Sequence, residues 1–352
     1  MIQTQLTGKV QTVLGPIDAD DIGTTLFHEH LLVSMAAYFQ EPAEPAAKKL
    51  AHEPLTMENV RQVRLDRNIN LDNTILADEQ IAIKEALLYK EAGGKTIADV
   101  SNNGLGRNPL GLQHIAQATG LNIIMGAGYY VRISHPSDMA TKTEEEITNE
   151  IVRDITVGVG DTGVRSGVIG EIGCTEPLLD GERKVLRAAA KAQKEIGAPL
   201  MIHPPFNDDL ALEVVQILTD AGADLEHTVI CHVNVYGFSP NTCREIANAG
   251  CYIGYESFGN LAYPHLYLGH LLQHRSDLDY IDAIIRLIDD GYIDHILVAH
   301  DICFKDFLRT YGGHGYAHIL ENAIPIMKIQ GMSDNQINTL FFENPKKYFQ
   351  FH

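Results

Sequence analysis

The feature that most constrains the fold is one pattern that recurs eight times along the chain. In each case a short, β-prone apolar run ends in polar residues or glycine and is followed by a helical stretch. Most of these runs are too short and too rich in β-branched residues to be buried helices. The predicted strands are TTLFHEH (24–30), KTIADVS (95–101), NIIMGAG (122–128), GVIGEIG (167–173), PLMIHPP (199–205), HTVICHV (227–233), CYIGYES (251–257) and HILVAHD (295–301).

Helical patterns fill the intervals between these runs. Three of them combine helical apolar spacing with a glycine where a C-cap is expected: DEQIAIKEALLYKEAGG (78–94), GERKVLRAAAKAQKEIGAP (181–199) and NDDLALEVVQILTDAGAD (207–224). Eight strands alternating with helices predict a parallel sheet, and eight is the number that closes a barrel. An open doubly wound sheet is the alternative, but its glycine-rich phosphate loop after the first strand is missing. We therefore predict an α/β protein with a (β/α)8 TIM barrel.

The sequence predicts a single domain over residues 1–352. No linker or low-complexity segment divides the chain, and barrels of this length commonly form one unit. The interval between the first two strands, about 31–94, is unusually long and contains PAEPAAKKLAHEP, which is typical of an exposed loop. In a barrel such an insertion lies on the catalytic face, where it forms either a lid or a surface decoration.

Charge and targeting signals restrict the classes of partner. The formal net charge is −19, and we find no cluster of lysine and arginine, so binding to nucleic acid or to an anionic membrane surface is not expected. The N-terminus lacks a signal-peptide pattern, and no run approaches the roughly 18 apolar residues of a membrane span. The five cysteines form no CxxC pair, which favours reduced thiols. We expect a cytoplasmic protein with a small-molecule substrate. Assembly into a homodimer is compatible with the sequence.

The ends of the predicted strands carry the candidate functional residues. A barrel places its chemistry at the C-terminal ends of its strands. The first strand ends in His28-Glu29-His30. Side chains two residues apart on a strand point to the same side, so His28 and His30 can bind one ion together while Glu29 faces away. The other strand ends supply Glu171, His203, His232 and Asp301.

Each of these residues also has an ordinary structural explanation. A single histidine in a strand is usually a hydrogen-bonded core residue, Glu171 could belong to a buried ion pair, and Asp301 could be a helix N-cap. All of these explanations would have to hold at once, at matching strand ends. Four imidazoles and two carboxylates suit zinc, manganese, iron or cobalt, and they are too many for one tetrahedral ion. The set therefore favours a two-metal site. His300 should point away from it.

Several longer motifs resemble those of a known family. GTTLFHEHLL, TGVRSGVIGEIGC, MIHPP, CHVN, VAHDICFK and the late stretch TYGGHGYAHILENAIPIMKIQGMSDNQINTLFFENPKKYF are similar to the phosphotriesterase-related proteins of the amidohydrolase superfamily. The resemblance runs from about residue 6 to the C-terminus. It implies an amidohydrolase-type barrel in which two divalent ions, with zinc the first choice, activate water for hydrolysis.

The resemblance also implies a role for each ligand. His28, His30 and Asp301 would hold the buried ion, with Asp301 as the catalytic base. The more exposed ion would be held by His203 and His232, and the shared ligand would be Glu171. Bacterial phosphotriesterases carry a carboxylated lysine at that shared position. The glutamate keeps the bridging oxygens but weakens any transfer of phosphotriesterase activity to this chain.

The substrate is the least constrained part of the interpretation. Five loop residues could contact a small, anionic substrate: Tyr129, Tyr130, Arg107, Arg132 and Lys305. Our first hypothesis is hydrolysis of a carboxyl ester or lactone. The alternative, suggested by animal members of the branch, is an amidase acting on N-acyl amino acids or N-acyl taurines. A phosphotriesterase and a metal-holding scaffold without turnover are the remaining hypotheses.

Overall fold

Eight parallel strands form a nearly closed barrel, which confirms the predicted fold. The computed structural model describes residues 6–260, 265–267, 270–272 and 275–352. The strands are hydrogen-bonded in the order β14-β11-β10-β9-β8-β7-β6-β3. Across the remaining gap, the backbone N–H of Asp301 donates to the carbonyl of His28 at 3.2 Å. The strands are β3 (Thr25–Glu29), β6 (Thr96–Asp99), β7 (Asn122–Ala127), β8 (Val168–Gly173), β9 (Leu200–His203), β10 (Thr228–Ile230), β11 (Tyr252–Tyr255) and β14 (Ile296–Val298).

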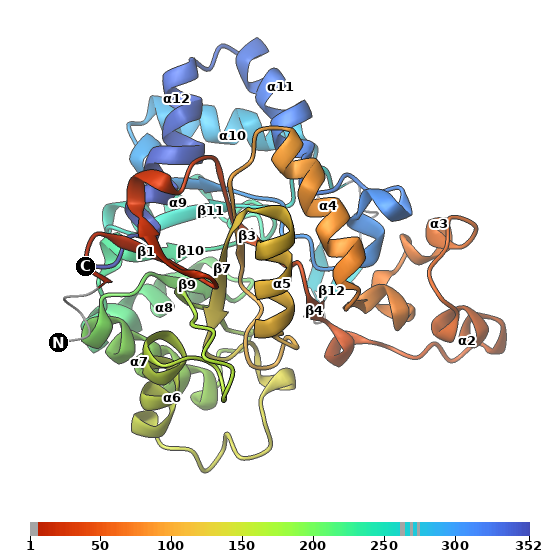
Figure 1. Ribbon diagram of the computed structural model, residues 1–352, viewed down its shortest axis with the longest axis horizontal. Coiled ribbons are helices and arrows are strands. Elements are labelled where there is room, and N and C mark those ends of the chain that lie inside the picture. The colour runs from red at the N-terminus through yellow and green to blue at the C-terminus, as the bar shows by residue number, and fades with distance from the viewer. Residues whose placement is uncertain (1–5, 261–264, 268–269, 273–274) are drawn as a thin grey trace.

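Helices connect successive strands and surround the barrel (Figure 1). The connecting helices are α4 (Glu79–Glu91), α5 (Pro109–Thr119), α6 (Glu144–Thr156), α7 (Asp180–Ile196), α8 (Asp208–Ala221), α9 (Pro240–Asn248) and α10 (Asp277–Asp289). After β14 the chain continues into α11 (Ile324–Ile329), α12 (Asp334–Asn338) and α13 (Asn344–Phe349). The three helices expected from sequence are α4, α7 and α8. As predicted, α7 and α8 end on glycines in the left-handed conformation, Gly197 and Gly222.

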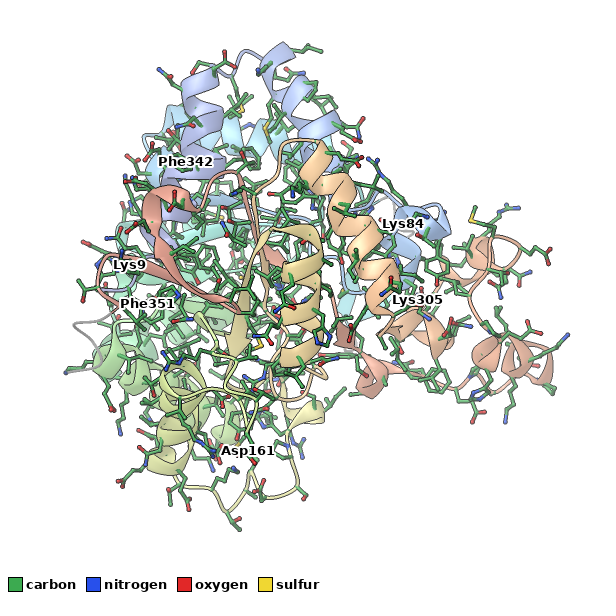
Figure 2. The ribbon with its side chains drawn as sticks, in the orientation of Figure 1. Lys9, Lys84, Asp161, Lys305, Phe342 and Phe351 are labelled. Carbon is green, nitrogen blue, oxygen red and sulfur yellow. The ribbon has the colours of Figure 1, made fainter. Side chains whose placement is uncertain are left out.

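The interior of the barrel is a packed apolar core that takes side chains from every strand. The hairpin of β1 (Lys9–Thr12) and β2 (Gly15–Asp18) and helix α13 contribute to the same cluster, so they cover the end of the barrel opposite the functional site. The last residues of the chain pair with this hairpin, and Phe351 is labelled beside it in Figure 2. The core comprises Val10, Ala19, Ile22, Phe27, Ala98, Val100, Ile124, Val168, Met201, Val229, Cys231, Tyr252, Leu297, Ala299, Tyr348 and Phe349.

Two strands change their register where they approach the functional site. Between Leu26 and Glu29, β3 runs three residues while its partner β6 runs two. A similar shift occurs in β8 between Ile169 and Ile172. An extra residue in one strand reverses the inward–outward alternation that follows it. For this reason β3 can direct Phe27 into the core and the next residue into the site.

The segment between β3 and α4 forms a separate layer beside the barrel. It contains α2 (Pro45–His52), α3 (Val60–Val63) and a two-stranded pairing of β4 (Val33–Ser34) with β5 (Ile75–Leu76). In Figure 1 the α2–α3 part projects from the body of the molecule. A second small hairpin, β12 (His265–Tyr267) with β13 (His270–Leu272), follows β11. Within the described residues, no helix is both long and apolar enough to cross a membrane.

Candidate metal centre

Glu171, in the second half of β8, lies at the centre of the cluster. Its Oε1 atom is 2.7 Å from Nδ1 of His203 and 2.8 Å from Nε2 of His232. Nε2 of His28 lies 3.7 Å from the same oxygen. All four side chains are buried. One carboxylate oxygen therefore faces three imidazole nitrogens that come from three other strands or strand ends.

Asp301 and His30 complete the cluster. Oδ1 of Asp301 is 3.4 Å from Nε2 of His30 and 3.7 Å from Nε2 of His28. The Asp301 side chain is 21% exposed, whereas the side chains of His28 and His30 are 0% and 3% exposed. Asp301 is thus the acidic member that opens toward a reactant. The structure brings together all six residues that the sequence predicted as ligands.

The donor atoms fit the binding of divalent metal ions. Nε2 of His28 is buried and has no hydrogen-bond partner among the described residues, although a buried polar nitrogen normally has one. A metal ion would satisfy it. Ligand atoms of His28, His232 and Asp301 lie within 4.8 Å of one another, and so do those of two further groups that share Glu171. Imidazole and carboxylate donors suit ions such as zinc.

The second nitrogen of His28, in β3, and that of His30, just after this strand, are each held by a polar side chain. Nδ1 of His28 lies 3.3 Å from Oε1 of Glu256, and Nδ1 of His30 lies 2.9 Å from Oγ of Ser101. These contacts leave the Nε2 atoms directed at the cluster. Outer partners of this kind fix ring orientation and increase ligand basicity in metal sites.

His203, on β9, is held by two tyrosines. Its Nε2 lies 2.8 Å from Oη of Tyr236, and Oη of Tyr130 lies 3.4 Å from its Nδ1. Tyr236 in turn stacks on Phe206, with the ring centroids 3.7 Å apart. The tyrosines therefore fix the ring plane of His203 and form part of the wall beside it.

The backbone is locally strained where three strands reach the site. His232, Ser257 and Asp301 have positive φ angles of 57°, 65° and 59°. Residues other than glycine adopt this conformation at a cost of about 1–3 kcal/mol, and it is commonest at functional sites. At His232 the left-handed turn matters most. The preceding Cys231 belongs to the barrel core, so simple alternation would turn the imidazole outward.

Glu29 faces away from the cluster, as the sequence predicted. Its Oε1 accepts hydrogen bonds from the backbone N–H of His300 at 2.8 Å and from Nδ1 of the same residue at 2.7 Å. Its Oε2 accepts from the backbone N–H of Ile302 at 3.0 Å. The carboxylate thus binds the backbone N–H groups of the two residues that flank Asp301. His300 points away from the ligands as well, consistent with its predicted structural role.

The pKa values of the two carboxyl groups in the cluster are lowered, whereas that of Glu29 outside the cluster is raised. Burial alone would raise the pKa of Glu171, but the rings of His203 and His28 outweigh it and hold the pKa well below its usual value. Burial opposes ionisation of Asp301 too, yet hydrogen bonding from His30 and the charge of His28 lower its pKa to about 2. Glu29 has no comparable cationic surroundings, and burial raises its pKa to about 8.

A cavity of about 80 Å³ opens onto the ligands. Its wall combines five of the six metal-ligand candidates, all except His28, with aromatic and apolar side chains. The lining residues are His30, Met35, Arg67, Leu105, Tyr130, Glu171, His203, His232, Val235, Tyr236, Ser257, Asn260, Asp301, Cys303, Phe304 and Phe307. Of the five side chains that the sequence offered as substrate contacts, Tyr130 is in this wall.

The structure places the other four candidates elsewhere. Arg107 pairs with Asp154 at 2.7 Å and donates to the carbonyl of Gly126. The Tyr129 hydroxyl donates to Glu150, away from the cavity. Arg132 is exposed and borders a different surface hollow. Lys305, labelled in Figure 2, pairs with Asp72 at 2.6 Å. Ion pairs thus occupy Arg107 and Lys305, and a hydrogen bond occupies Tyr129; their positions in loops could not reveal these partners.

Sequence reasoning missed several residues of the cavity and its support. Arg67 and Met35 come from the 31–94 insertion, which the sequence placed on the catalytic face without showing which of its side chains reach the cavity. Tyr236 lies four residues after the metal-ligand candidate His232. Its closeness to a ligand candidate in the sequence could have identified Tyr236 as part of the site. Glu256 could also have been identified, because it is an acidic residue at the end of the seventh predicted strand.

Comparison with known proteins decides the family. The model of the phosphotriesterase family matches residues 8–349. The chain belongs to this family. It is 39% identical over 350 residues to the N-acetyltaurine hydrolase of Xenopus tropicalis, with 99% of each chain covered. It is 38% identical over 349 residues to the N-acetyltaurine hydrolase of Homo sapiens, again covering 99% of each chain.

Solved structures support the same assignment. A resiniferatoxin-binding protein from Rhodobacter sphaeroides superposes with a TM-score of 0.92 at 36% identity, covering 97% of this chain and 95% of the other. A lactonase from Listeria monocytogenes superposes with a TM-score of 0.80 at 22% identity, covering 98% and 99% of the two chains, and this likeness shows the fold. The family member described here is therefore a metal-dependent hydrolase of an amide or ester bond.

Proposed function

We propose that this phosphotriesterase-family protein is an amidase that hydrolyses N-acetyltaurine or a close N-acyl amide with an acidic end group. The carrying observation is the meeting of three imidazoles and two carboxylates at the wall of one small cavity, with the fourth imidazole, that of His28, buried among them. The named relatives support the amide bond, because their likeness to this chain extends over almost its full length. We now favour the amidase over the ester or lactone hydrolysis preferred from sequence.

We further propose that the cluster holds two divalent ions, with zinc the first choice. His28, His30 and Asp301 would hold one ion, and His203 and His232 the other, with Glu171 shared. The orphaned Nε2 of His28 supports this proposal. Bound there, the ions would supply Lewis acidity that acidifies water and polarises a carbonyl group.

Asp301 is the proposed general base. Its side chain is the most exposed of the acidic groups in the cluster and lines the cavity. It would take a proton from the attacking water and pass it to the nitrogen of the amide as the C–N bond breaks. The products are acetate and the free amine, here taurine. Glu171 and the histidines hold the reacting groups in place, and the two tyrosines beside His203 keep that ring oriented.

The size of the cavity supports a short acyl group. The volume of the cavity is only about 80 Å³. This space suits an acetyl group better than a long fatty-acyl chain.

The decisive experiment is turnover by the zinc-loaded protein. N-acetyltaurine, N-acetyl amino acids, a series of lactones and a phosphotriester would be compared by their kcat/KM values, with taurine release measured by mass spectrometry. We expect the highest value for N-acetyltaurine. Turnover confined to lactones would favour the hypothesis of ester or lactone hydrolysis. No turnover by a metal-loaded, folded protein would overturn the enzymatic proposal.

We also propose a cytoplasmic location. All five cysteines are buried free thiols. This state is expected in a reducing compartment.

A further inference from the structure

Arg67 is a cationic side chain in a cavity wall that otherwise consists of aromatic, apolar, polar and acidic side chains and histidines. Among the described residues that line this cavity, it is the one lysine or arginine. It comes from the 31–94 insertion, whereas the proposed metal ligands come from the ends of barrel strands. Its exposure is only 5%. A buried arginine needs partners, so its surroundings indicate which of its hydrogen-bond donors are already used.

One edge of the guanidinium group is committed to the protein. Nε of Arg67 donates to both carboxylate oxygens of Asp306, at 3.1 and 3.0 Å. The guanidinium also lies over the ring of Phe307, with its central carbon 4.3 Å from the ring centroid. These contacts hold the side chain in place before any ligand arrives. Preorganised donors bind an anion with a smaller entropy cost.

The other edge is turned toward the cavity. Nη2 of Arg67 donates to Oδ1 of Asn260 at 3.2 Å, and Asn260 itself lines the cavity. No hydrogen bond of Nη1 to another described residue is found in the structure. A planar guanidinium has five N–H donors, so several remain for a bound anion.

The charge of Arg67 is not cancelled by Asp306. That buried carboxylate also faces Nε of Arg64 at 3.5 Å, and it accepts a hydrogen bond from Nδ2 of Asn73 at 3.2 Å. Two guanidinium groups therefore share one carboxylate. The two guanidinium groups and the carboxylate together carry a net charge of +1, in a molecule whose net charge is −19.

We propose that Arg67 recognises the anionic end group of the substrate and so makes the insertion a specificity-determining element of the site. This inference rests on the proposed function and deepens it. The substrate class is an N-acyl amine whose other end carries a sulfonate or carboxylate. The scissile carbonyl lies at the ligand cluster while the acid group lies against the guanidinium. Planar donor pairs match the geometry of such oxyanions, and a lysine cannot reproduce them.

A purely structural role for Arg67 makes a different prediction. If Arg67 served only to hold the insertion against Asp306, its loss would impair the hydrolysis of all substrates alike. If it recognises an anion, its loss would raise KM for charged substrates and leave KM for neutral ones unchanged. Three amides that share an N-ethylacetamide core separate these cases: N-acetyltaurine with a sulfonate, N-acetyl-β-alanine with a carboxylate, and N-ethylacetamide itself with no charge.

The experiment compares wild type with Arg67→Met and Arg67→Lys on these three amides. We expect Arg67→Met to raise KM for both anionic amides by about 10- to 100-fold, the range of a lost charged hydrogen bond, with little change on N-ethylacetamide. Arg67→Lys should give an intermediate KM and retain folding if Arg67→Met does not. Equal losses on all three amides, or no change in KM for the anionic ones, would overturn the proposal.

A matched control is Lys305→Gln. It also removes one positive charge, but from a side chain that pairs with Asp72 and does not line the cavity. Its KM values should stay at those of wild type. A rise in KM as large as that of Arg67→Met would show that overall charge, rather than the position of Arg67, controls binding.

A binding measurement separates failure of this inference from failure of the proposed function. If wild type hydrolyses none of the three amides, ethanesulfonate is titrated into the zinc-loaded protein by calorimetry. Binding by wild type that is lost in Arg67→Met and kept in Lys305→Gln would support the anion site although the amidase proposal had failed. Equal binding by wild type and Arg67→Met, or none by wild type, would refute it.

Discussion

Asp301 occupies a position that few residue types tolerate. Its φ of 59° lies in the left-handed region, where asparagine and aspartate are favoured among non-glycine residues. Asp301→Asn therefore keeps the backbone and an oxygen for the cluster but removes the proposed base. We expect kcat to fall by about 10²- to 10⁴-fold while the melting temperature stays near that of wild type. Full activity of a folded, metal-loaded variant would rule out the role of Asp301 as the base.

Glu29 stabilises the same backbone turn by hydrogen bonds. Its carboxylate accepts the backbone N–H groups of His300 and Ile302, which flank Asp301. In Glu29→Ala these buried donors lose their acceptor, which costs about 1–3 kcal/mol for each group. We expect a lower free energy of unfolding in urea and a lower kcat, because Asp301 is less well positioned. Wild-type values for both would show that the carboxylate does not fix this turn.

Among the elements, the strands were predictable in number and position, but the direction of their side chains was predictable only in part. Apolar runs and glycine stops located all eight strands and the helices α4, α7 and α8. The i, i+2 rule placed His28 and His30 together. It could not show that β3 and β8 carry an extra residue before the site, or that His232 turns through a positive φ. These irregularities arise from tertiary packing and leave no periodic signal.

Gly170 precedes Glu171 in β8 and has a backbone conformation that favours glycine. Its φ is 144°, and an added Cβ would lie 2.6 Å from Cβ and 2.7 Å from the carbonyl oxygen of Met201. We expect Gly170→Ala to lower the free energy of unfolding by about 1–3 kcal/mol and to reduce metal content. Gly181→Ala is the control, because an added Cβ there has open space within helix α7. It should be neutral or slightly stabilising. Equal stability of the two variants would contradict the argument.

At the scale of the whole molecule, the metal-ligand candidates could be predicted from the sequence, whereas most of the residues that line the cavity could not. Ligands at strand ends follow from the barrel itself, since the closed sheet brings those ends together. The pocket depends on how the 31–94 insertion packs over them, and its contacts with Asp306 and Asn260 join residues more than 190 positions apart. Such contacts are set by three-dimensional packing. Arg107, Tyr129 and Lys305 were attractive from loop position, but nearby acidic groups pair with them.

Removal of metal should destabilise the folded barrel as a whole. The cluster buries Glu171 among imidazoles and leaves Nε2 of His28 without a hydrogen-bond partner in the part of the chain that the structure describes, so ions that bind here stabilise the folded state. Ligand present at 100 times its Kd contributes about 2.7 kcal/mol. We expect about two ions per chain by elemental analysis. We also expect a chelator to lower the melting temperature by several degrees and zinc to restore it. Glu171→Ala, which lacks the shared oxygen, should hold fewer ions and respond less to the chelator. A wild-type protein that binds no ions after zinc loading, and melts identically with and without chelator, would favour the metal-free scaffold.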